Sequence, residues 1–117
     1  MTKTIFFHDD ENAIVIEPQQ NIFERGDPGD VMYVILEGEV AISVQGKIID
    51  TLGEGEIFGE MALIDDSPRS ATATATKQSK LVPVDKVRFT IAIQHNPYFA
   101  LQVMSIMAER LRALLNT

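Results

Sequence analysis

The sequence contains no cysteine and only two histidines, His8 and His95. Without cysteine, a disulfide, a zinc–thiolate site and a thiol nucleophile are all excluded. The two histidines lie far apart in different sequence contexts, so they do not form the pattern of a metal site. The adjacent acids Asp65 and Asp66 have no partner residues for a hydrolytic reaction. We therefore expect no metal site, no cofactor and no enzymatic activity.

Long apolar runs and basic residues are also scarce. No apolar run approaches the ~20 residues that span a bilayer, and residues 1–7 lack the apolar region of a signal peptide. The 10 lysines and arginines are outnumbered by 17 aspartates and glutamates, for a net charge of −7. Nucleic acids and anionic membranes require clustered basic residues. We therefore expect a soluble cytoplasmic protein that binds neither, in which an anionic ligand needs a local positive site.

Short apolar segments separated by glycine and proline turns fill most of the chain up to residue 85. Such regularly spaced segments predict an all-β sandwich or barrel. The strongest run, residues 31–36, is short enough for a buried strand. Gln45 and Gly46 predict a tight hairpin. Residues 70–76 alternate serine or threonine with alanine, which predicts a strand with one small, packed face.

The apolar period becomes helical after Asp85, which is a plausible N-cap. A short helix should end near Asn96, and a second should start about Pro97. The second helix carries one apolar stripe and a neighbouring apolar face. The stripe consists of Met104, Met107, Leu111 and Leu114. The neighbouring face consists of Phe99, Val103 and Ile106. We interpret the stripe first as a packing face and second as a dimerisation surface.

Residues 55–75 organise the chain. An apolar strand end breaks at Gly59, Glu60 begins a short apolar turn, and Arg69 follows nine residues after Glu60. A helix N-terminus offers backbone N–H groups and a positive dipole to an anion, and a guanidinium matches phosphate in two-point contact. A carboxylate accepts hydrogen bonds from a donor such as a sugar hydroxyl. The segment therefore predicts a cradle for a phosphorylated sugar.

The same residues resemble the phosphate-binding cassette of cyclic nucleotide-binding domains, as in the catabolite activator protein, protein kinase A regulatory subunits and nucleotide-gated channels. The resemblance rests on residues 58–63 (Phe-Gly-Glu-Met-Ala-Leu) and 68–72 (Pro-Arg-Ser-Ala-Thr), correctly spaced. Residues 23–27 and 33–40 are similar to the opening barrel strands of the family.

The resemblance implies a mainly β fold with flanking helices. It would be a double-stranded β-helix (jelly-roll) barrel of about eight strands, with a short cassette helix and two C-terminal helices. Residues 1–117 would form a single domain without a DNA-binding or other output domain. Its expected parts are an N-terminal lead (1–12), the barrel (13–85), and hinge and lid helices (86–117).

The resemblance also implies a 3′,5′-cyclic nucleotide as ligand, with cAMP slightly favoured over cGMP. Arg69 would bind the cyclic phosphate, helped by the Ser70 hydroxyl and nearby backbone amides, and Glu60 would bind the 2′-hydroxyl. Closing of the cassette would move the C-terminal helices. The implied ligand-binding residues are Gly59, Glu60, Met61, Ala62, Leu63, Arg69, Ser70 and Ala71. Of these, Met61, Ala62 and Leu63 are expected to pack in the core and offer only their amides.

Alternative interpretations remain open. Arg69 could be a surface arginine paired with Asp65 or Asp66, and Glu60 a carboxylate that only stabilises a helix N-terminus. The last residues, 114–117 (Leu-Leu-Asn-Thr), offer no clear hydrogen-bonding reader of a base. The alternative function is therefore a barrel that binds no nucleotide and uses its C-terminal helix for protein interaction or dimerisation. A metal-dependent barrel enzyme fits poorly, because the chain has no cluster of metal ligands.

Overall fold

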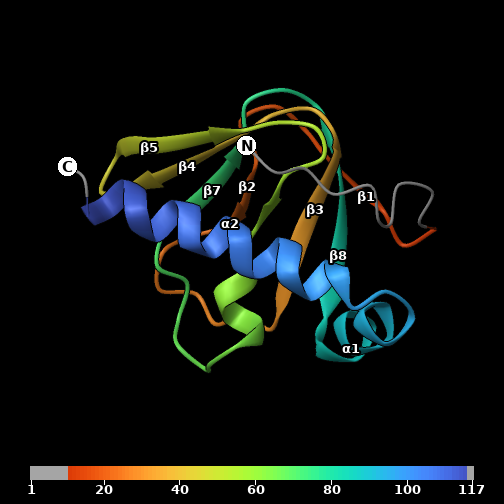
Figure 1. The fold of residues 1–117 in the computed structure, drawn as a ribbon. Helices are drawn as coiled ribbons and strands as arrows, with labels where there is room; N and C mark the ends of the chain where they lie inside the picture. The colour runs from red at the N-terminus through yellow and green to blue at the C-terminus, as the bar shows by residue number, and fades with distance from the viewer. Residues whose placement is uncertain (1–10, 116–117) are drawn as a thin grey trace.

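The computed structural model describes residues 11–115, in which eight strands form two antiparallel sheets followed by two helices (Figure 1). In chain order the elements are β1 (Ile14–Ile16), β2 (Asn21–Phe23), β3 (Val31–Glu37), β4 (Val40–Val44), β5 (Lys47–Leu52), β6 (Ile57–Phe58), the 3-10 turn η1 (Glu60–Leu63), β7 (Thr72–Ala75), β8 (Ser79–Asp85), α1 (Lys86–His95) and α2 (Tyr98–Leu115). This arrangement confirms the predicted jelly-roll fold. Residues 1–10, which make up most of the expected N-terminal lead, and the last two residues, Asn116 and Thr117, lie outside the described part.

The two sheets enclose the first part of the core. One sheet has the strand order β1-β8-β3-β6 and the other β2-β7-β4-β5. Their facing side chains form one apolar cluster, to which both sheets contribute. Its buried members are Ile16, Ile35, Val40, Leu52, Phe58, Ala73, Ala75 and Leu81. Burial of these side chains is the main source of stability for a domain of this size.

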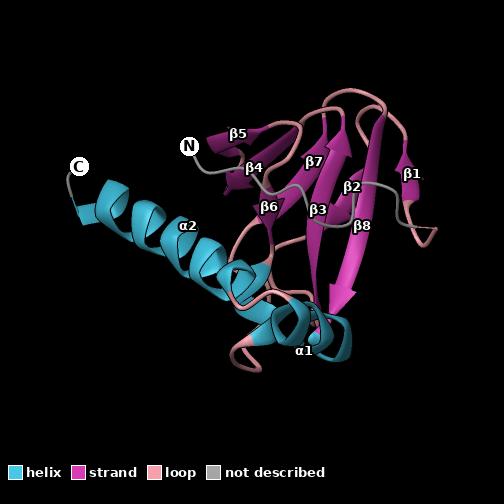
Figure 2. Ribbon diagram, turned by 45° about the vertical axis from the view of Figure 1, so that its right-hand side comes forward, coloured by secondary structure: helices cyan, strands magenta, loops and turns pink. Residues whose placement is uncertain are grey.

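Residues 31–36 of strand β3 are apolar because both faces of the strand are covered. Ile35 points into the cluster between the sheets. Met32 and Val34 point the other way, into a second cluster that includes side chains of α1 and α2. Strand side chains alternate between faces, so a strand covered on both sides needs an unbroken apolar run. The second cluster therefore fixes the helices to the outer face of the β3 sheet, and Figure 2 shows them together on one side of the strands.

Strand β7 follows its alternating sequence. Ala73 and Ala75 are fully buried between the sheets. The Thr74 hydroxyl donates to Asn21 Oδ1 at 2.6 Å, and the Thr72 hydroxyl accepts from the backbone N–H of Arg25 at 3.0 Å. The prediction of one small, packed face and one hydroxylated face is confirmed.

Local signals also placed the turn and the first helix correctly. Gln45 and Gly46 both have positive φ, 52° and 81°, as a two-residue hairpin of the right twist requires. The Asp85 carboxylate accepts from the backbone N–H of Arg88 at 2.8 Å, so it is the N-cap of α1. Helix α1 ends at His95 with Asn96 as its C-cap, close to the expected boundary.

Helix α2 packs through a different face from the one first predicted. Phe99, Val103 and Ile106 are buried in the second cluster. Met104 and Leu111, in the predicted packing stripe, are 55% and 58% exposed. Met107 of the same stripe does pack against the second cluster, so the prediction was wrong for Met104 and Leu111. Helix α2 has two adjoining apolar faces, and helical periodicity does not say which of them meets the sheet. Packing against the outer side chains of β3 and β8 determines which face of α2 is buried.

Candidate functional site

The chain turns sharply where β6 ends and η1 begins. Gly59 has φ 76°, a left-handed conformation that glycine adopts without steric cost. A Cβ atom at Gly59 would also lie 2.8 Å from Arg69 Nη1. Glycine is therefore required at this position both for the turn and for the close approach of the arginine.

Arg69 is buried beside this turn, with 8% of its surface exposed. Its Nη2 donates to the carbonyl of Val31 at 2.8 Å, and its Nη1 donates to the carbonyl of Gly59 at 3.2 Å. The guanidinium carbon lies 4.1 Å from the centroid of the Phe23 ring. Nε has no hydrogen-bond partner within the described part of the chain. The alternative of a solvent-exposed loop arginine is therefore wrong.

The charge on Arg69 is poorly solvated. Burial lowers the pKa of the guanidinium, and the neighbouring Tyr33, Asp30 and Asp27 act in the opposite direction. Burial likewise raises the pKa of the Tyr33 phenol, and the positive charge of Arg69 opposes that shift. A desolvated cation gains stability from any anion that approaches it. The space around Arg69 is thus electrostatically suited to a phosphate.

Glu60 is also buried, with 5% of its surface exposed, and its partner comes from α2. Arg110 forms an ion pair with Glu60 through Nη1 and Oε1, and its Nη2 donates to the carbonyl of Ile57. One side chain of α2 therefore contacts both β6 and η1. Figure 1 shows α2 passing over η1.

Sequence reasoning missed Arg110, although the sequence contained a signal. Arg110 lies four residues after Ile106 and seven after Val103, which places it on the buried face of α2. A charged residue on an apolar helix face needs a buried partner. The sequence does not say that Glu60 is that partner, because 50 residues separate the two.

The remaining predicted site residues differ in exposure. Ala62 is buried and its N–H donates to the carbonyl of Gly59 at 3.2 Å, while Leu63 packs against the second cluster. Met61 is 50% exposed, so its expected packing in the core was wrong; the tight η1 turn directs it outward. Ser70 is exposed and Ala71 is half-buried just after Arg69. The structure thus brings Gly59, Glu60 and Arg69 together around the η1 turn.

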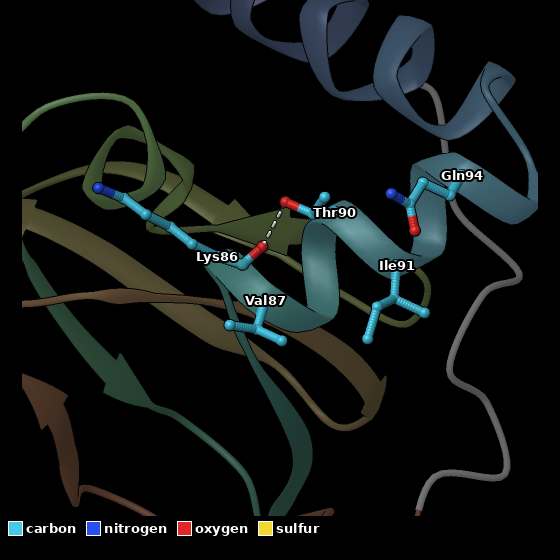
Figure 3. A pocket seen from close by; sticks show the side chains of 5 residues that line it. All are labelled: Lys86, Val87, Thr90, Ile91 and Gln94. Atoms are coloured by element: carbon cyan, nitrogen blue, oxygen red, sulfur yellow. Dashed lines mark hydrogen bonds between the residues drawn. The ribbon is translucent and has the colours of Figure 1, made fainter.

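A separate hollow of about 330 Å³ lies on α1 (Figure 3). All five of its lining residues belong to that helix: Lys86, Val87, Thr90, Ile91 and Gln94. The Thr90 hydroxyl donates to the carbonyl of Lys86 at 2.7 Å. None of the predicted site residues lines this hollow, and one helix alone does not enclose a ligand.

Residues 11–115 contain neither a cluster of metal ligands nor a membrane-spanning helix. No group of three or more histidines, aspartates and glutamates is arranged to hold a metal ion there. None of the helices in this range has the length and apolar character needed to cross a membrane.

Comparison with known proteins identifies the family. The model of the cyclic nucleotide-binding domain matches residues 13–96, which include all eight strands and α1. The chain belongs to the cyclic nucleotide-binding domain family. The family match agrees with the jelly-roll fold of the two sheets.

Individual relatives occur in several kinds of protein. A cGMP-dependent protein kinase from Eimeria tenella is 40% identical over 78 residues, which cover 64% of this chain and 8% of the kinase. The crystal structure of the Thermus thermophilus catabolite activator protein superposes with a TM-score of 0.79 at 30% identity, covering 87% of this chain and 50% of that one. The chain thus spans half or less of the length of these relatives.

Solved structures of a further relative, the EAL enzyme Bd1971, exist with either nucleotide. The cAMP-bound form has a TM-score of 0.64 at 37% identity, covering 89% of this chain and 29% of that one. The cGMP-bound form has a TM-score of 0.65 at 36% identity, covering 86% and 28%. Relatives of this chain therefore include proteins bound to cAMP and to cGMP.

Proposed function

We propose that this chain is a regulatory module that binds a 3′,5′-cyclic nucleotide through residues 59–71 and is itself not catalytic. The observation that carries the proposal is the buried guanidinium of Arg69, whose Nε lacks a partner within residues 11–115. A cyclic phosphate has two exocyclic oxygens and one negative charge. Its charged oxygens would be stronger acceptors for the guanidinium than the neutral carbonyls of Val31 and Gly59, and one of them would accept from the unpartnered Nε.

Glu60 would bind the ribose 2′-hydroxyl. An ionised carboxylate offers about four acceptor sites on two oxygens, and Arg110 contacts one of these oxygens. Binding of a hydroxyl would therefore change the Glu60–Arg110 ion pair directly. Since Arg110 belongs to α2, this contact is a physical route from the ligand to the helix. The ligand shifts α2 only if it binds more tightly with α2 in one position than in another.

Of the two nucleotides, we propose that cAMP binds slightly more tightly than cGMP. The last turn of α2 presents the exposed apolar side chains of Leu111 and Leu115. Guanine carries a carbonyl oxygen and a ring N–H besides its amino group, whereas adenine carries the amino group alone, and such groups lose hydrogen bonds to water when they are placed against apolar side chains. Adenine therefore loses fewer hydrogen bonds to water at this surface, which favours cAMP.

Calorimetric titration with cAMP and cGMP tests the proposal, using protein that has been unfolded and refolded to remove carried-over nucleotide. We expect binding at one site per chain. Arg69→Ala should weaken it by about 2 kcal/mol or more, roughly 30-fold, because a buried charge pair loses one partner. Lys47→Ala, an exposed residue with the same change in charge, is the control and should bind normally. Equal affinity of the Arg69→Ala variant and the wild type would refute the phosphate role.

A second candidate function, as a protein-interaction or dimerisation module, is favoured by the outer face of α2. This face carries exposed apolar residues along the helix. They are Leu101, Met104, Leu111 and Leu115, with the half-buried Ala108 between them. We call these five residues the α2 seam. Folded protein that gives no heat and no thermal shift with either nucleotide would favour this second function.

A further inference from the structure

A turn far away in the sequence holds the backbone of Arg69. The N–H of Arg69 donates to the carbonyl of Asp27, and the carbonyl of Arg69 accepts from the N–H of Gly26, both at 2.8 Å. The turn is itself closed by Glu24 and Asp27. The N–H of Asp27 donates to the carbonyl of Glu24 at 3.0 Å, and the N–H of Glu24 donates to Asp27 Oδ2 at 2.9 Å. The cassette arginine is thus fixed by a segment outside the cassette.

Gly29, at the end of this turn, lies against the guanidinium. A Cβ atom at Gly29 would lie 2.2 Å from Nε, 2.4 Å from Cζ and 2.6 Å from Nη2 of Arg69. Unlike Gly26 and Gly59, Gly29 does not have a positive φ. The backbone at position 29 is therefore not in the left-handed region that disfavours alanine, and the three atoms nearest to an added Cβ all belong to the Arg69 guanidinium.

We propose that Gly29 is a positioning residue for Arg69, an inference that rests on the proposed function. The missing side chain leaves the space in which the guanidinium lies between the Phe23 ring and the carbonyls of Val31 and Gly59. Because the clash involves the flexible end of Arg69, Gly29→Ala should move the guanidinium rather than the backbone. The anion site should be lost while the fold remains.

The first experiment needs no ligand. Gly29→Ala is made in the wild type and in the Arg69→Ala background, and thermal unfolding is measured. In the wild type we expect the Tm to fall by about 2 °C or more, because Arg69 loses its two carbonyl contacts. In the Arg69→Ala background we expect no fall, because nothing opposes the new methyl group and the unfolded chain loses entropy. Equal changes in the two backgrounds would overturn the inference.

Gly53→Ala is the matched control. Gly53 also lacks a positive φ, and its nearest contact to an added Cβ would be Glu56 Oε1 at 4.0 Å. Its effect on the Tm should be the same in both backgrounds. As a second readout, the Nε–H resonance of Arg69 in a ¹⁵N–¹H spectrum should shift in Gly29→Ala and stay in place in Gly53→Ala. An unshifted resonance in Gly29→Ala would contradict the proposal.

The second experiment titrates the same variants with cAMP and cGMP. We expect at least tenfold weaker binding for Gly29→Ala, normal binding for Gly53→Ala, and no further loss when Gly29→Ala is added to Arg69→Ala. Wild-type affinity of Gly29→Ala would refute its positioning role for the ligand. If the wild type binds neither nucleotide, the proposed function fails, whereas the unfolding cycle still decides whether Gly29 positions Arg69.

Discussion

The guanidinium of Arg69 lies against a cluster of three aromatic rings, those of Phe23, Tyr33 and Phe58. Tyr33 stacks on Phe58 with ring centroids 5.2 Å apart, and Phe23 lies 5.9 Å from Phe58. The guanidinium carbon is 4.1 Å from the Phe23 centroid and 6.0 Å from that of Tyr33. Aromatic faces attract a cation but do not neutralise it. The cluster therefore keeps Arg69 in place and leaves its charge available to an anion.

Tyr33 gives a prediction for the pH dependence of stability. Burial raises the pKa of Tyr33 above its ordinary value of 10.0. Well below pH 10 the phenol is protonated in both the folded and the unfolded state. Above about pH 10 the unfolded chain releases this proton before the folded protein does, so the free energy of unfolding falls as the pH rises toward the folded pKa. Tyr33→Phe should reduce this fall in urea unfolding measured from about pH 8 to about pH 11.

The control for this experiment is Tyr98→Phe, since Tyr98 is largely exposed on α2. This variant should lose stability with pH as the wild type does. Identical pH profiles for Tyr33→Phe and the wild type would show that the buried phenol does not contribute.

At the scale of elements, α2 is joined to η1 by the ion pair between Arg110 and Glu60. The side chain of Glu60 is 6% exposed and that of Arg110 is 31% exposed. A partly exposed ion pair contributes little net stability, whereas a carboxylate left buried without its partner is costly. The contact therefore makes the position of α2 depend on Glu60 more than it strengthens the fold.

Removing the arginine tests this dependence. Arg110→Met keeps much of the side-chain volume and leaves Glu60 unpaired, so we expect a loss of about 2 kcal/mol in the free energy of unfolding. Adding Glu60→Gln should recover part of that loss, because the remaining group is neutral. The measurement is urea denaturation. Arg112→Met, which alters an exposed arginine two residues away, should change stability by less than about 0.5 kcal/mol. Equal effects of Arg110→Met and Arg112→Met would contradict the coupling.

At the scale of the whole molecule, the α2 seam faces outward. Leu101, Met104, Ala108, Leu111 and Leu115 follow a spacing of three and four residues in alternation. That spacing is the a/d pattern of a two-stranded coiled coil. The opposite face of α2 is already buried against the sheet. We therefore expect two copies of the chain to associate through their α2 helices.

Sedimentation equilibrium over a concentration series tests this association. Leu111→Glu places a charge in the seam and should weaken self-association at least tenfold, since like charges would meet in the interface. Ile48→Glu, which alters an exposed apolar residue on β5 outside the seam, should associate as the wild type does. A wild type that stays monomeric at every concentration, or a Leu111→Glu variant that dimerises normally, would rule out the seam as the interface.

The sequence alone was sufficient to predict those parts of the structure that depend on residues close together in the chain. The alternation in residues 72–75, the Gln45–Gly46 turn and the Asp85 cap each encode a local conformation, and each formed as predicted. The nearness of Gly59 to Arg69 was also readable, because only ten residues separate them along the chain. Periodicity, turn geometry and capping act over a few residues, so one chain displays them without a partner.

Contacts between distant segments depended on packing. Periodicity did not select the Phe99 face of α2 over the Met104 stripe, and it did not pair Arg110 with Glu60 or bring Gly29 to Arg69. Each of these contacts joins residues on different elements, and its geometry is fixed only when the two sheets and the helices share one core. The local elements and the cassette follow from short-range physical chemistry, whereas the support of the cassette and the link to α2 follow from how those elements pack together.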